Sequence, residues 1–360
     1  MNALFRVITL LLVSIGTCFA HPGTIHITFI SPNPDDQDFW GITHNFARAS
    51  AKDLNIDLDI VYSATNRYAY LKNVRQACAS IDKPDYLVAV FHRAIAEDIL
   101  FIAEECQIPI FMVNAGIPKE DKATIGNIRE NYKFFIGHMA PSEHFAGYLL
   151  GKQLIKSARD KSLSDTIEIV GISGRRDGPE ALARNEGLKQ AAREQNVLLH
   201  QIVFADWSGD KAGKQAAELI KRYPNVSIIW AASDHMSINV KNTIDRVGSS
   251  DKVITGGIDW TKDGINAVRS GLLEASVGGH FAELGFTMVL LYDHYHGIDF
   301  ISEYPSTIYS EMHLLSRENI AQHYDFITNQ DWEKVDFTRF SKAFNPDIKQ
   351  YDSSFDNLNQ

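Results

Sequence analysis

The chain has 360 residues, 45% of them hydrophobic, and a formal net charge of −10 at pH 7. This length is enough for two domains of ordinary size. The acidic balance, with no clustered stripe of Lys and Arg, argues against a nucleic-acid-binding protein and against one that binds an anionic membrane surface.

The first twenty residues are predicted to be a signal peptide and not part of the fold. Arg6 gives a short positive start, an apolar run follows over residues 7–18, and the run up to Ala20 has the small-x-small pattern of a signal peptidase site. The apolar run is shorter than a comfortable membrane span of about 20 residues. The alternative is a lipoprotein that carries its lipid on Cys18, for which Thr17 is a poor match. We therefore expect an exported, periplasmic protein that is cleaved after Ala20.

From residue 25 onward, apolar runs of strand length alternate with amphipathic stretches of helix length. The expected strands are 25–30, 56–62, 86–91, 108–113, 134–137, 167–172, 198–203, 227–231, 253–256 and 273–277. The expected helices are 42–54, 68–81, 94–106, 141–158, 179–195, 211–222, 235–247, 261–270 and 282–296. This alternation is typical of βαβ units and parallel sheets, and ten strands exceed one comfortable sheet. The pattern predicts an α/β protein with two lobes, followed by a tail over residues 316–360 that packs on a lobe.

Two cysteines follow the leader, Cys78 and Cys106. Each falls near the end of an expected helix, and in a doubly wound sheet those two helices run parallel on one face. A disulfide needs Cα atoms within about 7 Å of each other, which neighbouring helices only sometimes permit. An oxidising compartment favours the bridge, and two free buried thiols are the alternative.

Aromatic and polar side chains collect at the carboxyl ends of the expected strands, where open α/β sheets bind ligands. Rings suit the apolar faces of a sugar, and planar polar groups suit its vicinal hydroxyls. One further candidate lies about two turns inside the helix that begins at residue 179. The set is Asp38, Phe39, Trp40, His92, Asn114, Arg184, Trp207, Ser233 and Asp259.

Each of these residues also has a common role that involves no ligand. Phe39 and Trp40, which we place in the loop after the first strand, would otherwise plug the top of the core. An Asp after a strand is often a helix N-cap, and Asp234 is best interpreted as a cap or a supporting residue. Arg184 would otherwise be a solvated surface charge. The convergence of such residues from both halves of the chain favours the binding site.

Motifs of catalysis and metal binding are missing from the sequence. It has no Gly-x-Ser-x-Gly elbow, no Walker loop and no His-Glu-x-x-His. His294 and His296 are two residues apart on an expected helix, so their rings point to different faces. Asp35, Asp36 and Asp38 lack the Gly and the distal Glu of a calcium loop. We therefore expect neither an enzyme nor a metal or cofactor site.

From about Thr24 to Ser316, the chain resembles the type I periplasmic solute-binding proteins of the ribose- and galactose-binding kind. The resemblance implies two doubly wound parallel-sheet lobes that are joined by a three-segment hinge and close over a small polar ligand. The implied lobes are residues 21–137 with 280–305, and residues 138–279 with 306–360. The matching runs are Asp38-Phe39-Trp40, Ile108 to Asn114, Arg184-Asn-Glu-Gly-Leu188, Ala205-Asp-Trp207, Ser233-Asp234, and Gly256-Gly-Ile-Asp259 followed by Asp263-Gly264.

The chain departs from the ribose binders at three positions. Ala115 stands where they carry an Arg, Ser233 replaces an Asn, and a Gln expected near the third hinge segment becomes Gly279-His280. His280 therefore joins the expected ligand residues. Ribose specificity is not carried over by the resemblance, and we expect Trp40 to face Trp207 across a closing cleft.

The resemblance implies a monomer that delivers a monosaccharide or related polyol to an inner-membrane ABC permease. The alternative within the same fold is a sensor subunit like the autoinducer-2 receptors, which signals to a membrane kinase or cyclase. Asn114 and Arg184 are compatible with both branches, whereas Trp207 and Asp259 favour a sugar. The effector domain of a sugar-responsive repressor shares the fold but needs an N-terminal helix-turn-helix, where this chain has the expected leader. No nucleic-acid partner is expected.

Overall fold

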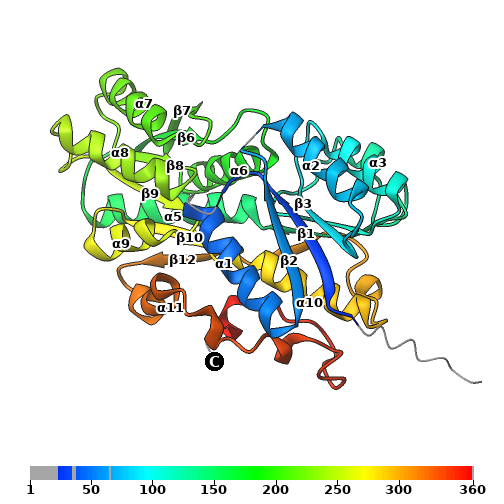
Figure 1. Cartoon of the computed structure of the whole chain (residues 1–360). Helices are drawn as coiled ribbons and strands as arrows, with labels where there is room; N and C mark the ends of the chain where they lie inside the picture. Colours follow the sequence, from blue (N-terminus) through cyan, green and yellow to red (C-terminus); the bar gives the residue numbers. More distant parts are fainter. Residues whose placement is uncertain (1–22, 35–37, 65, 359–360) are drawn as a thin grey trace, which may run out of the picture.

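The computed structural model describes residues 23–34, 38–64 and 66–358, so the predicted signal peptide lies outside the described residues. The chain forms two lobes, and each is built on one six-stranded sheet (Figure 1). The N-terminal lobe contains, in sheet order, β2 (Ile56–Tyr62), β1 (Ile25–Ser31), β3 (Tyr86–Val90), β4 (Ile110–Val113), β5 (Phe135–Pro141) and β11 (Ile308–Ser310). The C-terminal lobe contains β7 (Leu198–Phe204), β6 (Glu168–Ser173), β8 (Ile228–Ala231), β9 (Ile254–Ile258), β10 (Ala275–Gly278) and β12 (His313–Ser316).

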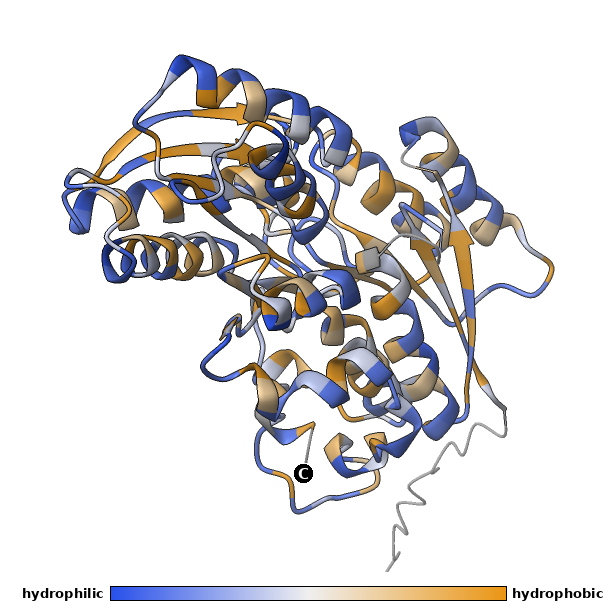
Figure 2. Ribbon diagram, turned by 90° about the vertical axis from the view of Figure 1, so that its left-hand side faces the viewer, coloured by the Kyte–Doolittle hydropathy of each residue, from blue (hydrophilic) through white to orange (hydrophobic). Residues whose placement is uncertain are grey.

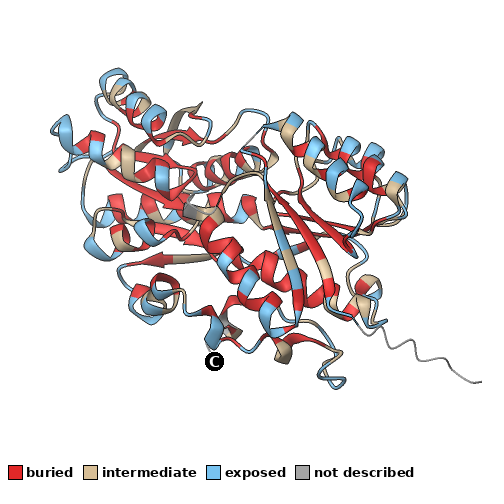
Figure 3. Ribbon diagram, viewed as in Figure 1, coloured by how far each residue is buried: buried red, intermediate tan, exposed pale blue. Residues whose placement is uncertain are grey.

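Neighbouring strands are parallel, apart from β12, which pairs antiparallel with β10. Central strands such as β3 are buried on both faces because helices cover both sides of a doubly wound sheet (Figures 2 and 3). The predicted fold class is therefore confirmed. The helices are α1 (Asp38–Asp53), α2 (Arg67–Ala79), α3 (Ala96–Cys106), α4 (Lys122–Ile125), α5 (Glu143–Asp160), α6 (Pro179–Glu194), α7 (Gly209–Arg222), α8 (Asp234–Arg246), α9 (Lys262–Ser270), α10 (Glu283–Tyr295) and α11 (Tyr324–Asn329).

The described chain crosses between the sheets three times. The first crossing follows β5, the second follows β10, and the third joins β11 to β12. Two predicted lobe boundaries need correction. The first lobe was expected to end at residue 137, but its strand β5 continues to Pro141. Residues from 306 onward were assigned to the second lobe, but β11 belongs to the first. β11 is a three-residue edge strand that pairs with β5 through Ile308 and Met139. A strand this short has too little apolar pattern to be recognised in a sequence.

The C-terminal tail packs on both lobes, whereas the sequence predicted contact with one. On the C-terminal lobe, the hydroxyl of Tyr324 in α11 donates to Oδ1 of Asn266 in α9 at 2.6 Å. On the N-terminal lobe, the backbone N–H of Phe337 donates to Asp53 of α1 at 2.9 Å, and Tyr351 donates to Asp293 of α10 at 2.8 Å. The tail therefore joins the two lobes outside the three crossings.

The outer helices of the N-terminal lobe carry a disulfide. Cys78 in α2 and Cys106 at the end of α3 are bonded, with their Cα atoms 5.7 Å apart. The two helices pack against each other, as the parallel arrangement requires. Of the two alternatives that the sequence left open, the structure shows the disulfide. Among the described residues, no helix has the length and apolar character to cross a membrane.

Candidate functional site

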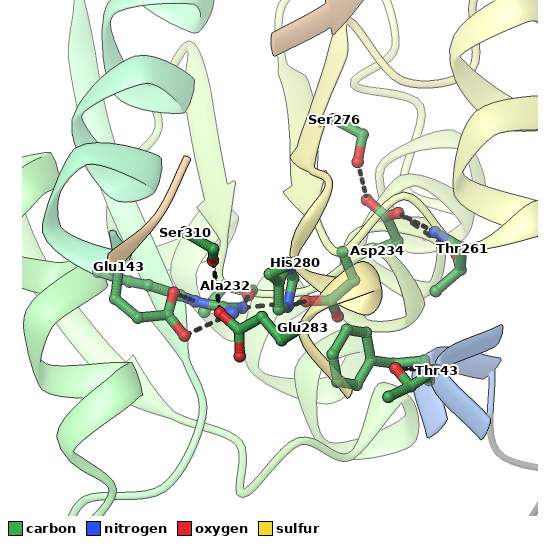
Figure 4. A network of polar contacts seen from close by, with 12 residues as sticks. Thr43, Glu143, Ala232, Asp234, Thr261, Ser276, His280, Glu283 and Ser310 are labelled. Carbon is green, nitrogen blue, oxygen red and sulfur yellow. Dashed lines mark hydrogen bonds and ion pairs between the residues drawn. The ribbon is translucent and has the colours of Figure 1, made fainter. Parts of the chain in front are cut away.

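A buried cluster of charged side chains lies where the C-terminal lobe meets the hinge (Figure 4). At its centre is Arg184 of α6, whose side chain is 4% exposed. Its Nε and Nη2 donate to the two carboxylate oxygens of Glu143 at 2.5 and 3.0 Å, and Nη1 donates to the carbonyl of Ala232 at 2.7 Å and to Asp259 at 3.2 Å. The two-pronged contact with Glu143 is the strongest geometry available to an arginine. Arg184 is thus no solvated surface charge.

The charge of Arg184 is secured by its neighbours. Burial alone would lower the pKa of the guanidinium, but the carboxylates of Glu143 and Asp259 outweigh it and hold the pKa above its usual value. The cluster places two carboxylates against one cation, so its local charge is negative.

Asp259 ends a strained turn after β9. Asp259 and Trp260 have φ angles of 128° and 56°, a region that non-glycine residues adopt only when their surroundings impose it. Asp234 imposes it: its Oδ2 accepts the backbone N–H of Thr261 at 3.0 Å, and its Oδ1 accepts the hydroxyl of Ser276 at 2.7 Å. A Cβ on Gly264 would lie 2.1 Å from Asp234 Oδ2, so only glycine fits there. Asp234 therefore has the supporting role that the sequence suggested.

Ser233 and Trp207 lie close to this cluster. Ser233 is the N-cap of α8, and its hydroxyl oxygen accepts the N–H of Met236 at 3.2 Å. Trp207 follows β7 with a φ of 62° and packs directly on Gly174. The guanidinium of Arg184 lies 5.6 Å from the Trp207 ring centroid, within cation–π distance. Trp207 therefore adds an aromatic face to the charged wall.

His280 connects the cluster to the other lobe. It lies in the second crossing and is 2% exposed, with Nε2 3.7 Å from Asp259 Oδ1. Burial, and next the charge of Arg184, lower the pKa of His280 well below its ordinary value, so the ring is neutral. Its Nδ1 is buried and has no hydrogen-bond partner among the described residues.

Phe39 and Trp40 lie on the first turn of α1, because that helix begins at Asp38 and not at residue 42 as predicted. The Phe39 ring stacks on His280 with centroids 4.5 Å apart. Trp40 packs edge-on against Phe39 at 5.3 Å and lies 6.3 Å from Phe29 of β1. Phe39 therefore meets the hinge, while Trp40 leans on the core of its own lobe. The side chain of Asp38 lies outside the described part of the structure.

Asn114 follows β4 with a φ of 73°. Its backbone N–H donates to the carbonyl oxygen of Met139 at 3.0 Å. The same N–H lies near enough to Glu283, the first residue of α10, to oppose the rise that burial causes in the pKa of that carboxyl group. Glu283 accepts a hydrogen bond from the hydroxyl of Ser310 in β11. Asn114 therefore lies near the second hinge crossing.

Glu143 and Glu283 are not among the site residues that the sequence predicted. Each opens a helix directly after a hinge crossing. The only signal available was an acidic residue at a helix start, which the helix dipole explains without any site. Their importance becomes visible once the fold brings the crossings together.

The outer end of the cleft carries an ion pair between the lobes. Arg67 of α2 pairs through Nη2 with Asp177, which lies in the loop before α6, and its Nε donates to Nε2 of His92 at 3.3 Å. Burial, and next the charge of Arg67, lower the pKa of His92. A cavity of about 340 Å³ lies beside this pair and is lined by residues that include Phe91, Arg93 and Asp177. His92 therefore lies beside the ion pair that joins the lobes, whereas the charged cluster lies at the hinge.

The described residues contain no group of three or more His, Cys, Asp or Glu side chains placed to hold a metal ion. What the structure brings together is a set of hydrogen-bonding groups with aromatic covers. Arg184, Asp259, His280 and Phe39 are linked by direct contacts, and Trp207 joins them through Arg184. Such a set can bind a polar molecule.

Comparison with known proteins gives a consistent result. A sequence model described as a periplasmic binding protein domain matches residues 27–296. The ribose import binding protein of Escherichia coli is 27% identical over 233 residues, which are 64% of this chain and 71% of that protein. The D-allose-binding periplasmic protein of the same organism is 22% identical over 256 residues, or 69% of this chain and 78% of the relative.

A solved structure resembles the whole fold. The crystal structure of a periplasmic sugar-binding protein from Pseudomonas fluorescens superimposes with a TM-score of 0.82 at 27% identity. The match covers 93% of this chain and 99% of that protein. The similarity to that protein therefore extends beyond the residues that the family match covers.

Proposed function

Because the chain belongs to the periplasmic binding protein family, we propose that it binds a monosaccharide or a related polyol between its lobes and delivers it to the permease of an ABC transporter. The observation that carries the proposal is the buried set of Arg184, Asp259 and His280 with Phe39 stacked against it. Sugar hydroxyls both donate and accept hydrogen bonds, so they suit a site in which carboxylates, an arginine and a neutral imidazole converge.

The charge of the site favours an uncharged ligand. Glu143, Asp259 and the carbonyl of Ala232 together engage the guanidinium of Arg184 through four hydrogen bonds, which leaves one of its five N–H groups for a ligand. A ligand carboxylate or phosphate would approach two protein carboxylates at short range and low dielectric, which is repulsive. Neutral hydroxyl groups carry no such penalty.

The candidate contacts come from both lobes. On the N-terminal side we assign Phe39, Trp40, His92 and Asn114, and on the other side Arg184, Trp207, Ser233, Asp259 and the hinge residue His280. Because contacts to both lobes exist together only in the closed form, the ligand stabilises closure. We propose that Trp207, which lies beside Arg184 on the charged wall, provides the aromatic face on that side of the ligand.

The relatives support transport as the role. The names of the two E. coli proteins refer to ribose import and D-allose binding, which favours delivery to a permease over the sensor alternative. Ala115 and Ser233 replace residues of the ribose binders, so we leave the sugar open within the class of neutral monosaccharides and polyols. We also propose that the protein acts as a periplasmic monomer after removal of residues 1–20.

A thermal-shift screen tests the proposal directly. D-ribose, D-allose, D-galactose and D-fructose form the neutral panel, and D-glucuronate and D-glucose 6-phosphate are the anionic controls. A ligand at 100 times its Kd stabilises the folded state by about 2.7 kcal/mol, which a melting curve resolves. We expect a shift with at least one neutral sugar and none with the anions. Shifts with the anions alone, or with no sugar, would contradict the proposal.

A further inference from the structure

Glu283 lies where the second and third hinge crossings meet the N-terminal lobe. It opens α10 directly after the second crossing, and its Oε1 accepts the hydroxyl hydrogen of Ser310, the last residue before the third crossing. The backbone N–H of Asn114, just after β4, lies near enough to oppose the rise that burial causes in the pKa of this carboxyl group. Figure 4 shows Glu283 between Glu143 and His280, so it is surrounded by the residues of the proposed site.

The second oxygen of this carboxyl group has no partner. Oε2 is buried and makes no hydrogen bond within the described residues. In Figure 4 it points away from Ser310. An unpaired buried polar atom is costly, and native proteins nearly always satisfy such atoms with protein, water or a ligand. Nδ1 of His280, three residues earlier in the chain, is also buried and has no hydrogen-bond partner in the described part of the chain.

We infer that Glu283 is a further ligand residue that donates the hydrogen of a neutral carboxyl group, through Oε2, to an oxygen of the bound sugar. This inference rests on the proposed function. The two oxygens of the carboxyl group have different roles: Oε1 accepts a hydrogen bond from the Ser310 hydroxyl, and Oε2 is available to the ligand. A sugar with hydrogen in place of the contacted oxygen would leave Oε2 unpaired and bind more weakly.

The surroundings keep the group protonated. Burial raises the pKa of Glu283 to about 8, the hydrogen bond from Ser310 opposes this effect, and the charge of Glu143 adds to it. Arg184 is engaged by Glu143, and the rings of His280 and His138 have lowered pKa values that keep them neutral. The titratable or charged groups on the elements around Glu283 include Glu143 and Arg184 of the buried cluster, His280 of the second crossing, His138 of β5 and His44 of α1.

The test measures binding against pH in matched variants. The probe is the sugar of the neutral panel, D-ribose, D-allose, D-galactose or D-fructose, that gives the largest thermal shift with the wild type. Calorimetric titrations from pH 6 to 9.5 compare the wild type with Glu283→Gln, Glu283→Leu and Glu180→Gln. Glu180 is the matched control, because it is a second carboxyl group on α6 whose pKa burial raises, to about 7, and on which the charges of Glu143 and Arg184 also act.

We expect the wild-type affinity to fall about tenfold per pH unit above the pKa of about 8. Glu283→Gln keeps an N–H donor, so its affinity should stay within a few-fold of the wild type and lose the alkaline decline. Glu283→Leu should bind about tenfold more weakly, the effect of one lost hydrogen bond. Glu180→Gln should keep the wild-type profile.

Two results would overturn the inference while the proposed function stands. The first is a Glu283→Leu variant that binds the sugar as tightly as the wild type. The second is a loss of affinity at high pH that persists in Glu283→Gln but disappears in Glu180→Gln. If the wild type binds no sugar of the panel, the proposed function fails and the inference fails with it. Because Glu283→Gln preserves the size and shape of the side chain, its pH profile remains informative even where Glu283→Leu does not fold.

Discussion

The two walls of the cleft are stabilised by different kinds of interaction. The wall of the C-terminal lobe is ionic: Arg184 is fixed by Glu143 and Asp259, and Asp234 fixes the turn that carries Asp259. The wall of the N-terminal lobe is neutral. Its supports are the stacked ring of Phe39, the hydrogen bond between Ser310 and Glu283, and the buried ring of His138.

His138 shows how the neutral wall is built. This histidine of β5 is fully buried, with Nε2 2.9 Å from the carbonyl of Ala115 and Nδ1 2.9 Å from the hydroxyl of Thr307. An N–H at Nε2 donates to the carbonyl, so Nδ1 accepts from the hydroxyl, and the ring carries no charge. The difference between the walls suggests that the ionic side fixes the orientation of a ligand, while the neutral side closes over it.

The largest expected effect comes from breaking the ionic wall. Arg184→Met should lower the free energy of unfolding by about 3–5 kcal/mol, because Glu143 is left buried without a counter-charge. Urea denaturation measures the loss, and binding in the thermal-shift panel should vanish. The control is Lys189→Met on the same helix, whose ion pair with Glu186 is exposed and contributes less than about 1 kcal/mol.

A second substitution tests whether the buried charge is the cause. The double variant Arg184→Met with Glu143→Leu should recover most of the lost stability, since it removes both charges. A double variant no more stable than Arg184→Met alone would mean that packing, and not charge, explains the loss.

The next effect concerns the neutral wall in acid. Burial lowers the pKa of His138 from 6.5 to about 4. As the pH falls from 6.5 to about 4, His138 binds a proton in the unfolded chain but not in the folded protein. The unfolded state is thereby stabilised, so the free energy of unfolding falls below its value above pH 6.5. The loss is roughly 3 kcal/mol. Urea unfolding at pH 7 and pH 4 should show a smaller acid loss in His138→Gln than in the wild type, and equal losses in both would contradict the neutral ring.

A smaller effect is expected from the aromatic cover. Phe39→Leu removes the ring stacked on His280 but keeps an apolar side chain, so affinity should fall by about 0.5–1.5 kcal/mol. The urea midpoint should move little. Phe344→Leu in the tail, where the ring is 47% exposed, is the control and should leave affinity unchanged. A Phe39 variant with wild-type affinity would place the ligand elsewhere in the cleft.

The smallest effect is expected at the mouth of the cleft. The pair between Arg67 and Asp177 joins the lobes but is partly exposed, so its loss in Arg67→Gln should weaken closure by no more than about 1 kcal/mol. Stopped-flow measurement should show release of a bound panel sugar up to about fivefold faster. Lys52→Gln breaks an exposed pair between α1 and the tail, away from the cleft, and should not change release.

The ten strands expected from the sequence all occur, because each is an apolar run bounded by turn residues. The strands and α-helices that were missed are α4, β11, β12 and α11, which are short and depend on contacts with neighbouring elements more than on their own sequence pattern. The tail was expected on one lobe because its scattered aromatic residues indicate burial but do not indicate the partner.

The candidate site could be predicted in part for a similar reason. Strand ends meet at one edge of a sheet, so Asn114 and Asp259 could be proposed from position alone. Arg184 could be proposed, but its partners could not, because Glu143 is 41 residues away along the chain. Glu283 was not proposed, because only the assembled hinge shows that its second oxygen lacks a partner.

The end of the tail reaches the back of the site. Phe355 packs against Trp260 with ring centroids 5.0 Å apart and against Phe281 at 6.1 Å, and these two residues directly follow Asp259 and His280 in the chain. A fluorescent dye attached to the tail near this point would lie behind the site, where it could report changes in the cleft without competing with the ligand for the site. The same closeness means that an affinity tag fused to the C-terminus is a poor choice for binding studies. The fold thus supplies its own attachment point for a biosensor.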